Sequence, residues 1–192
     1  MKNLDSKKFL ETLKAETRQY ILTLNRLRQE DPENLLEQPS TDKWSVAQVL
    51  EHLNTYSRYY LPLIASKINE NREKPERVFE SGWLGSYFIK SMLPKAGKVT
   101  NKMKAPKGHR PVSDLDNKVV LDEFEKHQQH LLQLLEKAEN RNLNKIRIPI
   151  SISWFIKINL GDTFGFLIAH QQRHFVQIAN TLNAVKQNKV TA

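Results

Sequence analysis

The most informative absence from this 192-residue sequence is cysteine. Without a thiol, the chain cannot form a disulfide framework, a thiolate metal site, a cysteine nucleophile or an iron–sulfur cluster. No glycine-rich phosphate loop is present. No apolar run approaches the roughly 18 residues that a membrane-spanning helix needs. The N-terminus enters a charged pattern directly, without an apolar signal core. These absences favour a cytoplasmic chain with no membrane span.

The residues that are present, 39% hydrophobic and 27% charged, are typical of a soluble globular protein. The length suits one domain covering residues 1–192. The formal net charge of +9 is concentrated in one segment. Between Ser81 and Ser113 there are seven Lys and Arg residues and no Asp or Glu, which leaves +2 (9 − 7) for the rest of the chain.

The basic segment at 95–110 has several interpretations. It could bind nucleic acid, meet an anionic membrane surface, place cations near an acidic substrate, or simply form a solvated loop. Nucleic acid is disfavoured, because the nearby aromatic residues Trp83, Tyr87 and Phe88 precede the lysines instead of alternating with them.

Four segments carry apolar residues every three or four positions, the period of an amphipathic helix. They span about 5–29, 45–69, 116–140 and 162–187. Ser45 and Gln48 match a capping box at the start of the second. The long connection at 70–113 contains a short helix at 83–93, and 35–43 and 141–154 are connectors, the latter with an extended stretch at 146–152. The pattern predicts an all-α four-helix bundle with a long crossover between the second and third helices.

Three histidines are the candidate metal ligands. His170 and His174 are four residues apart, so they share one helix face. His52 lies on the apolar stripe of the second helix. Metal sites in helix bundles are built from side chains that project inward from facing helices. Three imidazoles would leave positions open for substrate or water, and nitrogen ligands suit Zn, Ni, Cu or Fe better than Mg or Ca. Spacing alone also permits three ordinary core histidines.

Other polar residues near these patterns have less specific roles. His127 falls on the inner stripe of the third helix and could be a fourth ligand, a proton shuttle, or a residue of the pocket wall or core, of which the last is favoured. His109 lies in the basic segment and is expected to be solvated, and His130 to face outward. Arg173 is about 100° off the histidine face, and Gln177, one turn beyond His174, could orient that ligand.

Two motifs together resemble the DinB-like superfamily, including its bacillithiol-transferase-like branch. They are Trp44-Ser-Val-Ala-Gln-Val-Leu-Glu-His52-Leu and His170-Gln-Gln-Arg-His174-Phe-Val-Gln177-Ile. The resemblance spans most of the chain. It implies a four-helix bundle, often a homodimer, in which three histidines hold a divalent metal. Those ligands map onto His52, His170 and His174.

The resemblance also implies a function. The favoured expectation is a metal-dependent enzyme with thiol S-transferase-like activity, which activates a low-molecular-weight thiol at a Zn or Ni site to attack a small-molecule substrate. One alternative is a metal-dependent hydrolase that activates water at the same site. Another is a non-enzymatic binding module in which the metal is structural or absent. The sequence assigns no catalytic residue beyond the ligands, and the basic segment departs from the family.

Overall fold

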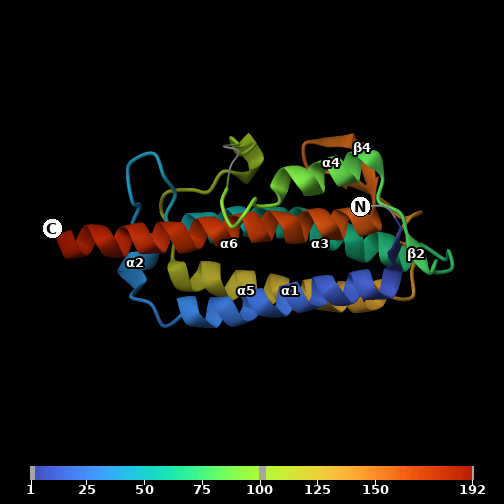
Figure 1. Cartoon of the computed structure of the whole chain (residues 1–192), viewed down its shortest axis with the longest axis horizontal. Coiled ribbons are helices and arrows are strands. Elements are labelled where there is room, and N and C mark those ends of the chain that lie inside the picture. The colour runs from blue at the N-terminus through green and yellow to red at the C-terminus, as the bar shows by residue number, and fades with distance from the viewer. Residues whose placement is uncertain (1–2, 100–102, 192) are drawn as a thin grey trace.

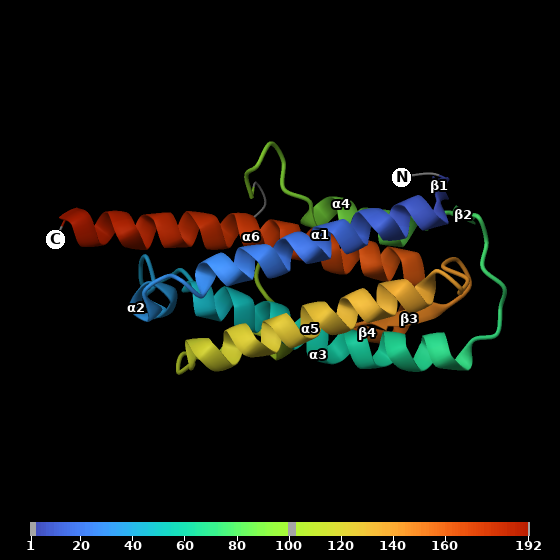
Figure 2. The ribbon, with the colours of Figure 1, turned by 90° about the horizontal axis from the view of Figure 1, so that it is seen from below.

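Four long helices dominate the computed structural model, which describes residues 3–99 and 103–191. Lys102 of the basic segment therefore lies outside the described residues. The long helices run side by side along the long axis of the molecule (Figures 1 and 2). They are α1 (Ser6–Leu27), α3 (Val46–Glu70), α5 (Asn117–Ala138) and α6 (Leu160–Thr191). The prediction of a mostly helical chain is confirmed. No helix among the described residues is both long and apolar enough to cross a membrane.

Shorter elements connect the long helices. The helical ones are α2 (Pro32–Leu36), α4 (Trp83–Met92) and the 3-10 turn η1 (Lys107–His109). The strands form two antiparallel pairs, β1 (Leu4–Asp5) with β2 (Val78–Phe79) and β3 (Arg147–Ile150) with β4 (Ser153–Asn159). The extended stretch expected at 146–152 is confirmed as β3, but its partner β4 and the β1–β2 pair were not predicted. The connector expected at 35–43 also differs from the prediction, because the short helix α2 includes its first two residues.

The helices begin where a side chain accepts a hydrogen bond from an amide that has no partner inside the helix. At the start of α3 the Ser45 hydroxyl accepts from the Gln48 amide N–H at 3.2 Å, and the Gln48 carboxamide oxygen accepts from the Ser45 amide at 3.0 Å. The predicted capping box is thus confirmed. Asp5 and Asp116 cap α1 and α5 in the same way. The caps fix the residue at which each of these helices begins.

The four long helices share one hydrophobic core. Leu24, Val49, Ile64, Phe124 and Phe164, one or more from each helix, are fully inaccessible to solvent. Burying an aliphatic or aromatic side chain of this kind stabilises the fold by about 1.5–3 kcal/mol. The core therefore holds α3 and α6, which carry the three candidate ligands, in a fixed relation to each other.

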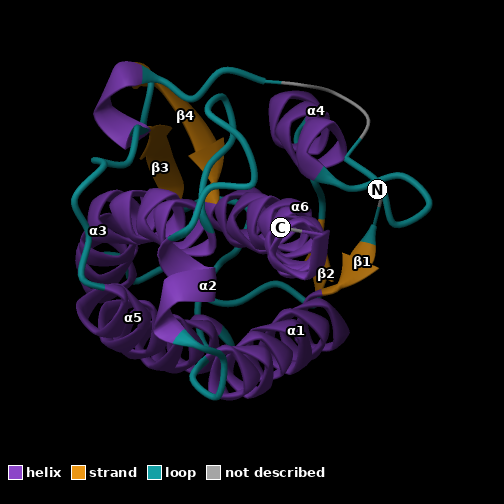
Figure 3. Cartoon of the chain, turned by 90° about the vertical axis from the view of Figure 1, so that its left-hand side faces the viewer, coloured by secondary structure: helices purple, strands orange, loops and turns teal. Residues whose placement is uncertain are grey.

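The first third of α6 is buried on all sides, from residue 160 to 171. Viewed end on, α4 and the β3–β4 hairpin lie on the side of α3 and α6 away from α1 and α5 (Figure 3). Gly85 of α4 approaches α6 so closely that a Cβ atom there would lie 2.0 Å from the Asp162 side chain. The helix begins at Leu160, two residues earlier than predicted, and Asp162 is in its first turn as expected.

Candidate metal centre

His52, His170 and His174 converge between α3 and α6. The Nε2 atom of His170 lies 3.2 Å from Nε2 of His52 and 3.0 Å from Nε2 of His174. All three side chains are nearly inaccessible, with 3%, 3% and 7% of their surface exposed. Within the described part of the chain these three residues form a group able to hold a metal ion, with ligand atoms all within 4.8 Å of one another.

The outer nitrogens of two of these rings have fixed hydrogen-bond partners. Nδ1 of His52 lies 2.6 Å from the main-chain carbonyl oxygen of His109, and Nδ1 of His174 lies 2.9 Å from the Gln177 carboxamide oxygen. Each Nδ1 must carry the proton in order to donate to an oxygen. In a neutral ring the lone pair is then on Nε2, the atom that faces the other two histidines.

Burial keeps the three rings neutral. Desolvation lowers the pKa of His52 to about 4 and that of His174 to about 3, and it lowers the pKa of His170 well below its usual value. The neighbouring histidines act in the same direction on His170 and His174, because two imidazolium ions at this distance would repel each other. All three residues are therefore in the state that binds metal ions at neutral pH.

The arrangement fits a transition metal. Two lone pairs, on His52 and His174, point at a third nitrogen that can donate at most one hydrogen bond, so with neutral rings at least one lone pair has no donor. A cation among the three nitrogens removes that conflict. Nitrogens bound to one metal at 2.0–2.1 Å lie about 3.0–3.4 Å apart, close to the two separations given above. Purely nitrogen donors suit Zn or Ni better than Mg or Ca.

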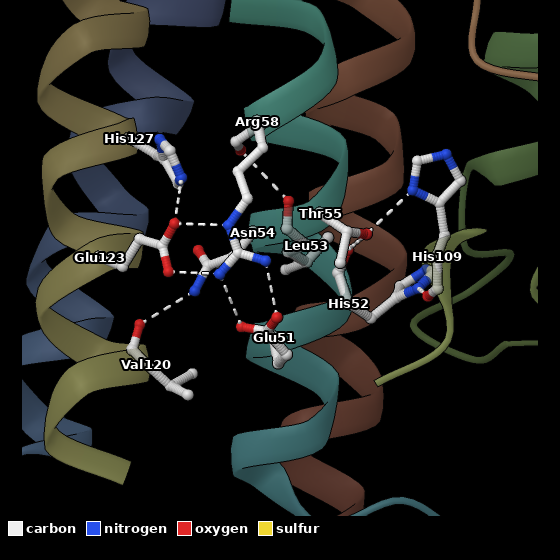
Figure 4. A network of polar contacts seen from close by, with 11 residues as sticks. Glu51, His52, Leu53, Asn54, Thr55, Arg58, His109, Val120, Glu123 and His127 are labelled. Atoms are coloured by element: carbon white, nitrogen blue, oxygen red, sulfur yellow. Dashed lines mark hydrogen bonds and ion pairs between the residues drawn. The ribbon is translucent and has the colours of Figure 1, made fainter. Parts of the chain in front are cut away.

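His109 is buried beside this group, although the sequence led us to expect it in solvent. Only 7% of its surface is exposed. Its ring stacks on Tyr56 with centroids 3.9 Å apart, and its Nδ1 lies 2.9 Å from the Thr55 hydroxyl (Figure 4). Thr55 in turn donates to the His52 carbonyl at 2.7 Å. The end of the basic segment is thus bonded to α3 at the ring of a candidate ligand and again at Thr55, about one turn further along the helix.

His127 lies elsewhere, so the prediction that it belongs to the pocket wall or core is wrong. It is half-buried on α5 and its Nε2 lies 3.1 Å from the Glu123 carboxylate, in a cluster with Arg58 (Figure 4). Gln128, the next residue, is the one that is fully buried. His127 is neither a fourth ligand nor a proton shuttle for the three-histidine group, which lies on the other side of α3.

A cavity of about 460 Å³ opens beside the three histidines. Trp44 and Tyr56 contribute aromatic walls, and the Trp44 ring lies 5.1 Å from the His52 ring. Residues 103–106 of the basic segment form another wall. Among the described residues, the charged side chains that line the cavity are the cations Lys43, Lys104 and Arg173 and the carboxylate Asp42. Burial lowers the pKa of Arg173. The space therefore favours a ligand that carries negative charge.

Comparison with known proteins agrees with the residues just described. The model of the DinB superfamily matches residues 12–178, which include all three histidines and most of the four long helices. The chain belongs to the DinB superfamily, whose members typically depend on a metal.

A curated relative matches a shorter stretch. The chain is 37% identical over 71 residues to a flavin-dependent thymidylate synthase of Dictyostelium discoideum. That match covers 34% of this chain and 23% of the relative, so the chain spans less than a quarter of that protein's length. No solved structure matches the chain.

Proposed function

We propose that this protein is a metal-dependent transferase that joins a low-molecular-weight thiol to a small electrophilic molecule. The observation that carries the proposal is the convergence of three neutral, buried imidazoles at the edge of a cavity with cationic walls. His52, His170 and His174 would hold Zn or Ni. A metal in such a site lowers the pKa of a bound thiol or water, which makes either a nucleophile near neutral pH.

The surrounding residues would orient the reactants. The His109 carbonyl and Gln177 hold the imidazole rings of His52 and His174 in one tautomer. Lys104 and Arg173, which both line the cavity, would attract the carboxylate of a thiol such as cysteine. The thiol sulfur forms a bond to the electrophilic carbon, and the bond to the leaving group breaks with its electron pair. The thiol proton passes to solvent.

The scarcity of carboxylates in the described lining supports thiol transfer over hydrolysis. Metal-dependent hydrolases commonly pair the metal with a carboxylate base that takes the proton of the attacking water. Among the described residues that line the cavity, the carboxylate is Asp42, whose side chain is exposed in the segment before α3. A thiol is more acidic than water before it meets a metal, so it ionises there without a carboxylate base. Water activation at the same histidines is the second candidate.

The first test measures metal content. Elemental analysis of purified protein should find about one Zn or Ni per chain, and His174→Ala should remove it. His130→Ala, a matched change outside the group, should leave it in place. If the wild-type protein holds no metal, and added Zn or Ni neither binds nor raises its melting temperature, the proposal fails.

The second test separates the two reactions. Metal-loaded protein is mixed with 1-chloro-2,4-dinitrobenzene, with cysteine, with 2-mercaptoethanol or without thiol. We expect thiol-dependent release of chloride, faster with cysteine because it carries a carboxylate. Thiol-independent hydrolysis of the electrophile would favour the hydrolase. Metal binding without either reaction would favour a binding module.

We also propose that the chain is one domain built as a four-helix bundle and that it forms a homodimer. All four long helices contribute to one core, which supports a single folding unit. Exposed aromatic residues on α4 and the hairpin, among them Trp83 and Trp154, offer an apolar surface. One cooperative unfolding transition would support the single domain. A mass of about twice 22.4 kDa by light scattering would support the dimer.

A further inference from the structure

A second cavity lies beside the three-histidine cavity. Its volume is about 230 Å³. It lies between α3, α4, the β3–β4 hairpin and the basic segment, and Tyr60, Phe88, Phe166 and Ile158 are among its lining residues. The proposed thiol chemistry has no part in this cavity, because the candidate ligands line only the first one.

The two cavities share a wall. Tyr56, Met92, Met103, Lys104 and Pro106 line both of them. The ring centroid of Tyr56 lies 4.4 Å from that of His170, so the shared wall begins directly at the candidate ligands. Methionine side chains are unbranched and adaptable, and two of them are in this wall. A molecule with its reactive atom at the histidines can therefore extend toward the second cavity.

The second cavity is mainly apolar, both at its floor and at its rim. Tyr60, Ile158 and Phe166 form a floor with at most 8% of any residue's surface exposed. At the rim, Tyr87 and Ile152 are 63% and 64% exposed. Such exposed apolar surface beside a cavity is characteristic of a binding site, since a ligand would cover it.

Two hydroxyl groups in this lining are already bonded within the protein. The Tyr60 hydroxyl accepts from the Ser151 amide at 3.0 Å, and the Ser91 hydroxyl donates to the Phe88 carbonyl at 2.8 Å. Lys104 is the charged residue of the described lining, and no carboxylate is part of it. A cationic ligand therefore has no partner there. An uncharged ring loses no hydrogen bond on entering.

We propose that this second cavity binds the uncharged aromatic group of the electrophilic substrate, while the thiol occupies the cavity at the histidines. The inference rests on the proposed function and names its substrate class. A dry cavity of about 150 Å³ is large enough for benzene, so about 230 Å³ suits a group of naphthalene size. Lys104, in the wall between the two cavities, would then lie beside any anionic group that links ring and reaction centre.

The test is equilibrium binding of N-phenyl-1-naphthylamine, an uncharged fluorescent aromatic probe, to the full chain. Ser91→Phe places a ring inside the second cavity and should raise the dissociation constant of the probe at least tenfold. Ser66→Phe adds the same ring at an exposed position on α3 and should not change it. Ile152→Glu, at the exposed rim, should weaken probe binding about threefold. This second variant keeps the test decisive if the larger side chain at position 91 prevents folding.

Metal uptake is measured on the same samples, so the two proposals can fail separately. His52→Ala should lose the metal and keep the probe, whereas Ser91→Phe should keep the metal and lose the probe. Probe binding that is unchanged in both Ser91→Phe and Ile152→Glu would overturn the second site, whatever the metal content. Equal weakening by Phe155→Ser, in the exposed hairpin outside the cavity, would also overturn it, because the probe would then be on the outer surface.

Discussion

The two sides of α3 carry two polar clusters of opposite character. On the side facing α5, Arg58 donates to Glu51 and Glu123, and Glu123 also pairs with His127 (Figure 4). In this cluster both carboxylates accept from the Arg58 guanidinium. On the side facing α6, three histidine nitrogens face one another instead. The charged groups of the first cluster are partnered within the protein, whereas the inner nitrogens of the second are placed where a cation could be held.

This difference explains why burial of a histidine does not by itself indicate a ligand. Desolvation lowers the pKa of His127 as it does for the three candidate ligands, but Glu123 opposes the effect on His127. The Glu123 carboxylate accepts a hydrogen bond from His127 and so connects this ring to the Arg58 network. The outer nitrogens of His52 and His174 face oxygens, and the inner nitrogens of all three candidate ligands face one another, so the inner lone pairs are available.

The largest effect is expected from removing a ligand. His170→Ala should reduce Zn or Ni affinity about 100-fold or more. Loss of a residue that only hydrogen-bonds to a metal ligand already lowers metal affinity about 10–100-fold, and loss of a ligand should have a larger effect. Isothermal titration calorimetry with Zn measures the dissociation constant of each protein. Zn at 100 times its dissociation constant should stabilise the wild type by about 2.7 kcal/mol and the variant by almost nothing. A variant stabilised as much as the wild type would mean that the metal binds elsewhere.

The next effect concerns the orientation of His174. Gln177→Leu removes the acceptor of the Nδ1 proton and should weaken metal binding about tenfold. Gln172→Leu, on the same helix but outside the cavity lining, is the matched control and should bind as the wild type does. Equal affinities in the two variants would show that Gln177 does not position His174.

The cluster on the opposite side should affect stability and leave metal binding alone. Arg58→Met removes both ion pairs and should lower the free energy of unfolding by about 1 kcal/mol, because the Arg58 side chain is 45% exposed and solvent screens the pairs. Urea unfolding measures the loss, and Arg18→Met at an exposed site of α1 is the control. A loss of metal affinity in Arg58→Met would contradict the independence of the two sides.

The smallest effect is a pH dependence of stability. The hydrogen bond from Arg58 holds the pKa of Glu123 below its usual value. The ionised form therefore stabilises the fold above the unfolded pKa, and this contribution is lost as the pH falls through the folded pKa. Glu123→Gln should reduce the loss of stability between pH 5 and pH 3 by about 0.5 kcal/mol, measured by urea unfolding. An unchanged loss would show that the pair contributes nothing.

The sequence predicted much of the helical fold because the signals are local. The apolar period and the Ser45–Gln48 cap are both confirmed. The third long helix shows the limit: its buried row passes through Gln128 and not His127. The apolar period alone does not determine which of two neighbouring polar residues, His127 or Gln128, faces the core. The partner strand β4 was missed because the turn at 151–152 has none of the glycine or asparagine residues that usually indicate a hairpin.

The ligand set was predicted as a hypothesis from spacing and resemblance, and the structure brings its three members together. The contribution of His109 was not predictable. It comes through a main-chain carbonyl, 57 residues from His52, and any residue type has that group. Nothing local to His109 indicates that the basic segment turns back to α3. The second cavity depends in the same way on where α4 and the hairpin pack.

The bond from the His52 ring to a carbonyl has a consequence for how this site can vary. No side-chain substitution at position 109 deletes that acceptor, although loss of the ring would remove its stacking on Tyr56. What the bond requires is that the segment place a peptide group at that point. Adding or deleting one residue between α4 and α5 would therefore disturb the candidate ligand His52 more than exchanging any single lysine there. The length of this segment, more than its composition, is the property tied to the candidate metal centre.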